Sequence, residues 1–290
     1  MTDSFPFFFA FLIVAGFFFL AVSRGVVSLL SSGVSFAIAL GVLFLCVQVL
    51  PGLVSKFADI DLQWKALLGV SAGAALVVFI FTRIIVGFLF KAILGPEGFL
   101  HAMSDGAAGG ILSFIPSFVV VIFLFTCIRI SGTVHELNYA ASLSRDGVAE
   151  LADQIPPYPW TGKWRDGVES IPLMAPALDL IDPFSNRANR NSAAFSIMNQ
   201  SSLIRAHLLS QPDSAKIASN EKIIAMNREG SLLKALESHD RVALVTNPKV
   251  KEIASDPDLN PLLKSLELRP VLVSYVKQLK SAVEPSPEIP

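Results

Sequence analysis

Residues 105–129 read DGAAGGILSFIPSFVVVIFLFTCIR, and this stretch decides the fold class of the chain. No charged side chain lies between Asp105 and Arg129. A helix rises about 1.5 Å per residue, so a run of this length spans a hydrocarbon core of about 30 Å. A single apolar run crosses lipid only as a helix, because lipid offers no hydrogen-bond partner to exposed backbone groups. The stretch therefore predicts a transmembrane helix.

The beginning of this stretch consists of small residues. Gly106, Gly109 and Gly110, with two alanines between them, leave a surface on which another helix can pack backbone to backbone. Asp105 precedes them, where a carboxylate suits the positive end of a helix. A phosphate-binding loop is the alternative, but such loops follow a strand, whereas this one opens a predicted membrane helix. We therefore expect a helix-packing site.

The composition divides the chain into an apolar front and a charged rear. Overall, 52% of the residues are hydrophobic, 16% are charged and 22 are Phe. Residues 1–128 contain five Lys or Arg and five Asp or Glu, out of 23 and 24 in the whole chain. This split predicts a membrane-embedded first part and an aqueous second part. Both parts are close to neutral, so we expect no nucleic-acid partner.

Three further apolar runs precede the quoted stretch, at residues 5–23, 26–50 and 66–90. The first lacks the preceding basic residues of a signal peptide, so we interpret it as an uncleaved helix. Arg24-Gly25 leaves almost no loop before the second run, and Pro51 is expected to end that run. The predicted fold is an all-α polytopic membrane protein: four transmembrane helices in two hairpins within residues 1–130, followed by a small all-helical soluble tail.

Arg83 interrupts the third apolar run and has two interpretations. It can mark the membrane boundary, with its guanidinium reaching the headgroups and residues 84–94 lying along the surface as an amphipathic helix. Alternatively, it can line a polar pathway, since intramembrane charges commonly serve function. The amphipathic pattern of residues 84–94, which include Lys91, favours the boundary.

The four runs resemble the membrane region of the CvpA family, the colicin V production proteins of bacterial inner membranes. The resemblance covers residues 5–130 and rests on Arg24-Gly25 after a Phe-rich first run, on Arg83, and on residues 104–110. This last segment, SDGAAGG, is similar in compressed form to the family pattern Asp-x-x-x-Gly-(small)-x-x-Gly.

The resemblance implies an inner-membrane accessory or scaffold protein, associated with toxin export or biosynthesis and with envelope homeostasis, and no enzymatic activity. Its partners would be the lipid bilayer and a membrane or envelope protein, with a homo-oligomer as an alternative. Basic residues are equally numerous at the two sets of helix ends, so the positive-inside rule does not orient the chain. The basic first and third loops usual in the family favour a periplasmic tail.

The charged rear of the chain divides into three segments. Residues 131–165 are expected to form a juxtamembrane helix and a linker rich in Pro and Trp. Trp160 and Trp164 are expected at the headgroup level, with a proline-rich ligand for a partner as the alternative. Residues 166–283 show short helical patterns and predict a helical soluble domain. Residues 284–290 contain three prolines and are expected to be a disordered end.

Two Pro-containing helix starts stand out in the tail, at Asn247-Pro248 and Asp256-Pro257. They are similar to the STI1-type helical modules of co-chaperones, whose short helices form a groove for apolar peptides. A helical bundle with good N-caps is the simpler interpretation. The candidate groove consists of Leu259, Leu262, Leu263 and Leu266.

The sequence contains no motif that predicts catalysis, a cofactor or a metal. The four histidines are scattered, and no Walker loop, dinucleotide fingerprint or nucleophile elbow is present. We therefore expect a protein that is not an enzyme. Three hypotheses remain: a scaffold using Arg24, Gly25, Arg83 and residues 105–110, a transporter or channel subunit using Arg83 and Asp105, and a membrane-tethered peptide-binding module.

Overall fold

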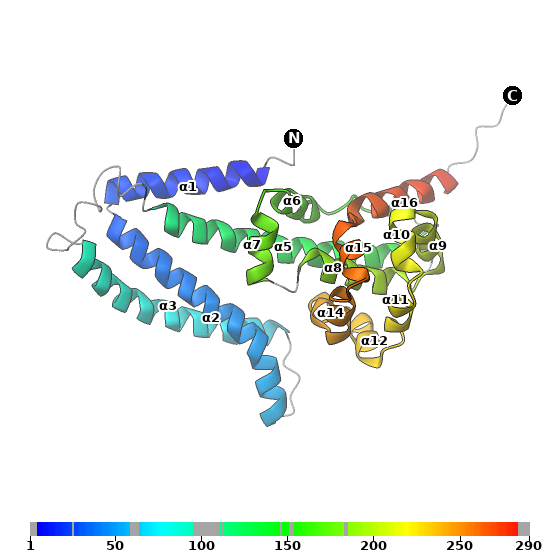
Figure 1. Ribbon diagram of the computed structural model, residues 1–290, viewed down its shortest axis with the longest axis horizontal. Helices are drawn as coiled ribbons and strands as arrows, with labels where there is room; N and C mark the ends of the chain where they lie inside the picture. The colour runs from blue at the N-terminus through cyan, green and yellow to red at the C-terminus, as the bar shows by residue number, and fades with distance from the viewer. Residues whose placement is uncertain are drawn as a thin grey trace. The chain divides into compact units, whose positions relative to one another are not determined.

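The computed structural model describes residues 5–24, 26–58, 64–94, 111, 113–145, 147–150, 154–182 and 185–283 (Figure 1). All regular elements among these residues are helices, which confirms the predicted all-α class. The chain forms two compact units. One spans Phe7–Leu124 and is called the apolar unit; the other spans Phe125–Pro290, with Met1–Pro6, and is called the C-terminal unit.

The apolar unit contains α1 (Phe5–Arg24), α2 (Val26–Ala58), α3 (Trp64–Leu94) and the first part of α5 (Phe114–Leu143). Helices α2 and α3 pack against each other. One expectation about this unit was wrong, namely that Pro51 ends the second helix. Helix α2 continues through Pro51 and ends at Ala58. Helix α3 passes Arg83 without a break and ends at Leu94.

Small residues on α2 allow close helix packing. A Cβ atom at Gly33 would overlap the ring of Pro116 on α5 and lie 2.8 Å from its Cα. A Cβ atom at Gly87 on α3 would lie 3.2 Å from the Oγ of Ser31 on α2. Ser31 and Ser35 are both buried. The interior of this unit therefore depends on close backbone approach.

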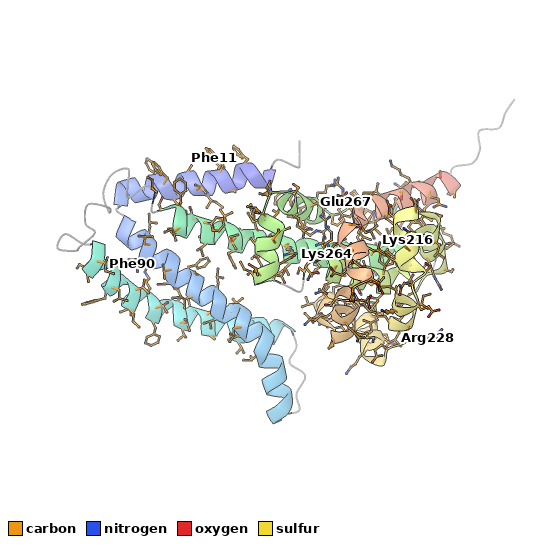
Figure 2. All side chains as sticks on the ribbon, in the orientation of Figure 1. Phe11, Phe90, Lys216, Arg228, Lys264 and Glu267 are labelled. Atoms are coloured by element: carbon orange, nitrogen blue, oxygen red, sulfur yellow. The ribbon has the colours of Figure 1, made fainter. Side chains whose placement is uncertain are left out.

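The exterior of the apolar unit is hydrophobic. Phe19 is 71% exposed and Phe88 is 80% exposed. The stretches Gly69–Ile93 and Phe114–Leu143 are long and apolar enough to cross a membrane, and only 6% of the most apolar part of the first is buried. Shorter apolar helical stretches cover Ala10–Phe19 and Leu29–Leu43. Figure 2 shows Phe11 on α1 among these exposed aromatic side chains.

The C-terminal unit begins with the second part of α5, which continues to Leu143 and confirms the predicted helix leaving the apolar run. An extended segment, residues 155–159, follows. The remaining helices are short. They are α6 (Trp160–Glu169), α7 (Met174–Ile181), α8 (Arg187–Met198), α9 (Ser202–Ser210), α10 (Pro212–Ala218), α11 (Glu221–Met226), α12 (Gly230–Glu237), α13 (Arg241–Thr246), α14 (Pro248–Ala254), α15 (Leu259–Ser265) and α16 (Leu268–Val283).

Helix α8 is the centre of the C-terminal unit. Residues 188–198 are all buried, and α8 contacts α11, α13, α14 and α15. The buried side chain of Asn191 donates hydrogen bonds to the carbonyls of Leu263 (2.7 Å) and Leu266 (2.9 Å). These bonds fix the end of α15, because a buried amide without partners would be costly. Lys216 and Arg228 lie on the surface of this unit (Figure 2).

The helix starts in the tail follow the predicted cap chemistry. Pro212 and Pro248 occupy the first positions of α10 and α14. The side chain of Asn247 accepts a hydrogen bond from the Lys249 amide at 2.9 Å. Helix α15 begins at Leu259, two residues after Pro257. The Asp256 carboxylate nevertheless caps this start by accepting a bond from the Leu259 amide at 3.3 Å.

Candidate functional site

Most residues of the predicted membrane site lie outside the described part of the chain. This applies to Gly25, Asp105, Gly106, Gly109 and Gly110. Arg24 is the last residue of α1, and its side chain is likewise not described.

Arg83 is the one residue of that site whose side chain the structure describes. It is exposed on α3, with its guanidinium carbon 5.9 Å from the centroid of the Phe79 ring. Its carbonyl accepts a weak hydrogen bond from Ser31 Oγ at 3.4 Å. Arg83 therefore projects outward from its own unit.

The four leucines of the candidate groove face the interior of their own domain. Leu259 and Leu263 are fully buried, and Leu266 is 5% exposed. Leu262 packs against the same core. An open peptide groove needs apolar side chains that are accessible to a ligand. These leucines instead form part of a helical bundle, which is the simpler of the two interpretations of the sequence.

The structure brings together a set of buried charges that sequence reasoning missed. The set contains five side chains, and we call it the buried ion cluster: Arg129, Glu136, Arg165, Glu169 and Arg190. The first two lie on α5, the next two on α6 and the last on α8. Buried charges are costly unless each is paired, so their arrangement decides whether this part of the fold is stable.

Glu136 holds the first half of the buried ion cluster. Arg165 donates to both of its oxygens, with Nη1 2.6 Å from Oε2 and Nη2 3.0 Å from Oε1. The hydroxyl of Tyr158, in the extended segment before α6, donates to Oε1 of the same carboxylate. Arg190 Nε lies 3.4 Å from Oε2. One carboxylate therefore connects α5, α6 and α8.

Glu169 holds the second half in the same way. Arg190 donates to both oxygens, each at 3.0 Å, and Arg129 Nε donates to Oε1 at 3.1 Å. Arg129 also pairs with Asp179 on α7. Arg187 Nη2 lies farther away, 3.6 Å from Oε2. Acidic and basic side chains thus alternate along the series of ion pairs: Asp179 on α7, Arg129 on α5, Glu169 on α6 and Arg190 on α8.

Neighbouring charges shift the pKa values of Glu169 and Arg165 in the directions that keep these two side chains ionised. Burial by itself would raise the pKa of Glu169, but the neighbouring charges of Arg190, Arg165 and Arg129 outweigh it and lower that pKa to about 2. Burial would lower the pKa of Arg165, but Glu136 and Asp166 raise it well above its ordinary value. Burial and the charge of Glu136 raise the pKa of Tyr158. These groups are not suited to donate and accept protons near neutral pH.

Local sequence explains how α5 and α6 approach closely enough to share these charges. A Cβ atom at Gly132 would lie 2.7 Å from both the Arg165 Cβ and the Thr161 carbonyl oxygen. Arg129 and Glu136 are seven residues apart, and Arg165 and Glu169 are four apart, so each pair lies on one helix face. The sequence signal for this site was therefore a pair of opposite charges on one face of each helix, with Gly132 between the charges of the first pair.

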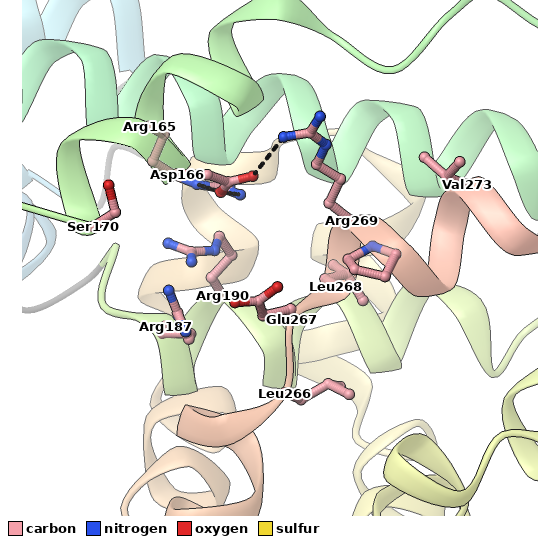
Figure 3. A pocket seen from close by; sticks show the side chains of 11 residues that line it. Arg165, Asp166, Ser170, Arg187, Arg190, Leu266, Glu267, Leu268, Arg269 and Val273 are labelled. Atoms are coloured by element: carbon pink, nitrogen blue, oxygen red, sulfur yellow. Dashed lines mark hydrogen bonds and ion pairs between the residues drawn. The ribbon is translucent and has the colours of Figure 1, made fainter. Parts of the chain in front are cut away.

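A cleft of about 550 Å³ adjoins the cluster (Figure 3). Its walls come from α6, α8 and the connection from α15 into α16. Four arginines and two carboxylates line it, together with small and apolar residues. The charged lining residues are Arg165, Asp166, Arg187, Arg190, Glu267 and Arg269. Guanidinium groups stay protonated, so this lining favours binding of an anion over acid–base chemistry.

Among the described residues, no group of three or more His, Cys, Asp and Glu is placed to hold a metal ion. Comparison of the chain with known protein families, with curated proteins and with solved structures finds no match.

Proposed function

We propose that this chain is a multi-pass protein of the bacterial inner membrane that acts as an accessory or scaffold protein of the colicin V production type and catalyses no reaction. The observation that carries the membrane part is the exposed apolar exterior of the described residues of the apolar unit. Monomeric soluble proteins rarely expose continuous apolar surface on this scale, whereas lipid solvates it. The sequence resemblance to the CvpA family supports the role.

The arrangement around α7 supports a position of the C-terminal unit at the membrane surface. Arg129 is the first charged residue after the apolar run of α5, so it marks the height at which lipid would end. Its ion pair with Asp179 holds α7 at that height. Leu180 is 87% exposed, Leu173 is 84% exposed and Trp160, at the start of α6, is 60% exposed.

These three side chains are the type that membrane interfaces accept. Trp is enriched at the headgroup level because its ring is amphipathic, and leucines on a surface helix bury their side chains in the acyl boundary. Leu173 also adopts a left-handed backbone conformation with φ of 66°. Such a conformation is unfavourable for a leucine, and an exposed leucine held in it suggests a binding role.

A membrane role for the chain is tested by fractionation of the full-length protein. We expect it to remain in the membrane pellet after alkaline carbonate washing and to dissolve only in detergent. Recovery of a monodisperse chain from buffer without detergent would overturn the proposal.

The side of the membrane occupied by the C-terminal unit is tested separately. A single cysteine is placed at the exposed position Ser265 in a chain whose Cys46 and Cys127 are replaced by Ala. For a periplasmic C-terminal unit, we expect an impermeant thiol reagent to label intact spheroplasts. Labelling only after lysis would place the unit in the cytoplasm and contradict the topology suggested by the family resemblance.

One observation favours a second function, as a subunit of a transporter or channel. Arg83 is exposed within the apolar stretch Gly69–Ile93, and a cation facing lipid is costly. An oligomer interface with a polar path would shield it. If Arg83→Leu leaves folding and partner capture intact but abolishes solute flux in liposomes, the transporter replaces the scaffold as the better account.

A further inference from the structure

Two of the four arginines that line the cleft beside the buried ion cluster are held only loosely by carboxylates. Both oxygens of Glu169 are occupied by Arg190 at 3.0 Å, so Arg187 reaches this carboxylate only at 3.6 Å. Asp166 is held by Arg165 Nη2 at 2.6 Å, and Arg269 Nη1 lies 4.0 Å from it. Arg187 and Arg269 are therefore the loosely paired cations of the cleft.

These two arginines are also the accessible ones. The side chains of Arg187 and Arg269 are 34% and 38% exposed, whereas those of Arg165 and Arg190 are 2% and 3% exposed. Figure 3 shows them projecting from α8 and from the start of α16, on different walls of the cleft. A ligand between the two walls would contact a guanidinium on each side.

The beginning of α16 adds a second source of positive potential. Leu268, Arg269 and Pro270 are its first three residues, and all three line the cleft. The first turn of a helix has backbone N–H groups without intrahelical partners and carries the positive end of the helix dipole. Because α16 has 16 residues, its dipole is well developed. A helix start and two available arginines thus converge on one space.

We infer that this cleft binds a phosphate group carried on a small molecule or on a lipid headgroup. Guanidinium forks match phosphate oxygens, and a helix start provides further N–H donors. A phosphate ester at neutral pH carries enough negative charge to neutralise both Arg187 and Arg269. The volume of about 550 Å³ exceeds the needs of a bare ion and lies in the range of small-molecule sites.

Glu267 distinguishes a phosphate-binding cleft from a cluster of charges that only stabilises the fold. Its carboxylate lines the cleft, is exposed, and has no ion pair among the described residues. A carboxylate at this position repels a bound phosphate. Glu267→Gln should therefore strengthen binding, whereas loss of an arginine should weaken it.

The experiment uses the full-length protein in nanodiscs of phosphatidylcholine, titrated calorimetrically with inorganic phosphate and with glycerol 3-phosphate. We expect binding that Arg187→Gln and Arg269→Gln each weaken about tenfold, which corresponds to about 1.4 kcal/mol for each lost charged contact. Glu267→Gln should tighten binding about threefold. Arg228→Gln, the same change on the exposed surface of the C-terminal unit, should leave affinity unaltered. Circular dichroism checks that all variants keep their helix content.

A second set of nanodiscs that include phosphatidic acid distinguishes the two phosphate sources. If these lipids suppress glycerol 3-phosphate binding, the headgroup occupies the cleft; if binding is equal in both sets, the ligand is a soluble ester. Both results support the proposal. It is overturned if neither phosphate compound binds and phosphatidic acid does not protect Arg187 and Arg269 from arginine-specific reagents. It is also overturned if binding is insensitive to Arg187→Gln, Arg269→Gln and Glu267→Gln. The proposal is independent of the scaffold role.

Discussion

Arg165 on α6 holds both carboxylate oxygens of Glu136 on α5, at 2.6 and 3.0 Å, and neither side chain is more than 2% exposed. This bidentate pair joins the helix that emerges from the apolar run to the first helix of the C-terminal bundle. Its two charges are removed from water, so each depends on the other for compensation. The first prediction tests that dependence.

Removing one partner of this pair should destabilise the C-terminal unit. Glu136→Leu leaves Arg165 buried without its main counterion, and we expect a loss of about 3–5 kcal/mol in the free energy of unfolding. Replacing both, as Glu136→Leu with Arg165→Met, should recover most of that loss, because neither fully buried charge of the pair then remains without the other. Urea unfolding in detergent, followed by circular dichroism, measures the free energy of unfolding of the single and the double variant. A double variant as unstable as the single one would show that the pair itself is required.

Stability should also depend on acid pH through Glu169. Its pKa is lowered from 4.5 to about 2 by Arg190, Arg165 and Arg129 acting against burial. A lowered folded-state pKa stabilises the fold above the unfolded value, and this contribution is lost as pH falls from about 4.5 towards 2. The contribution corresponds to about 3 kcal/mol.

The matched control for this pH dependence is Glu169→Gln. This variant should be less stable at neutral pH and should lose less stability between pH 4.5 and 2 than the unsubstituted chain does. Asp166, whose pKa is raised by burial, contributes in the opposite direction and is present in both chains. Equal acid dependence of the two chains would contradict the assignment to Glu169.

Close packing of α5 on α6 should be sensitive to a single methyl group. Gly132→Ala places a Cβ 2.7 Å from the Thr161 carbonyl oxygen and from Arg165 Cβ, so the helices must separate. We expect a loss of about 1–3 kcal/mol. Gly230→Ala is the control, because a Cβ there meets no atom within 4 Å. Thermal unfolding should show a lower Tm for Gly132→Ala and an unchanged Tm for Gly230→Ala.

The apolar unit offers a parallel test on α2. Gly33→Ala would overlap the ring of Pro116, whereas Gly41→Ala on the same helix meets nothing within 4 Å. We expect Gly33→Ala to weaken the packing of α2 with α5 and to increase proteolysis of the membrane-extracted chain. If both variants resist protease equally, α2 and α5 do not pack at Gly33.

The predicted position of α6 at the lipid surface can be measured with its own tryptophan. In a chain carrying Trp64→Phe and Trp164→Phe, Trp160 is the only tryptophan left of the three. Brominated lipids should quench its fluorescence, with stronger quenching by bromine near the headgroups than by bromine deep in the acyl chains. Leu173→Asp with Leu180→Asp should reduce the quenching. Emission that is unaffected by any brominated lipid would place α6 in water.

Sequence patterns predicted those parts of the fold that depend on composition over many residues. The apolar run before Arg129 predicted the long helix α5, and Asn247-Pro248 predicted the start of α14, because these signals act locally. The prediction that Pro51 ends the second helix was wrong, because a proline within a helix can kink it without ending it.

Helical spacing placed the charges of the buried ion cluster on common helix faces, but the pairing between helices could not be predicted because it joins residues far apart in the chain. Arg129 and Glu169 are forty residues apart, and each alone resembles an ordinary surface charge. The same holds for the groove leucines, since an apolar stripe at helical spacing is common to a core and to a binding surface. Burial separates the two, and Leu259 at 0% exposure lies in the core.

The continuity of α5 has a consequence for how the chain is made and divided. Its last turns supply Leu137, Ala140 and Leu143 to the core of the C-terminal unit, all fully buried. A cut after residue 130 would separate the Arg129 counter-charge from Glu169, and a cut after residue 143 would remove one wall of the core. The C-terminal unit is therefore incomplete without the second part of α5. During synthesis, folding of this unit must wait for the ribosome to release α16, which supplies Leu268, Leu272 and Tyr275 to the same core.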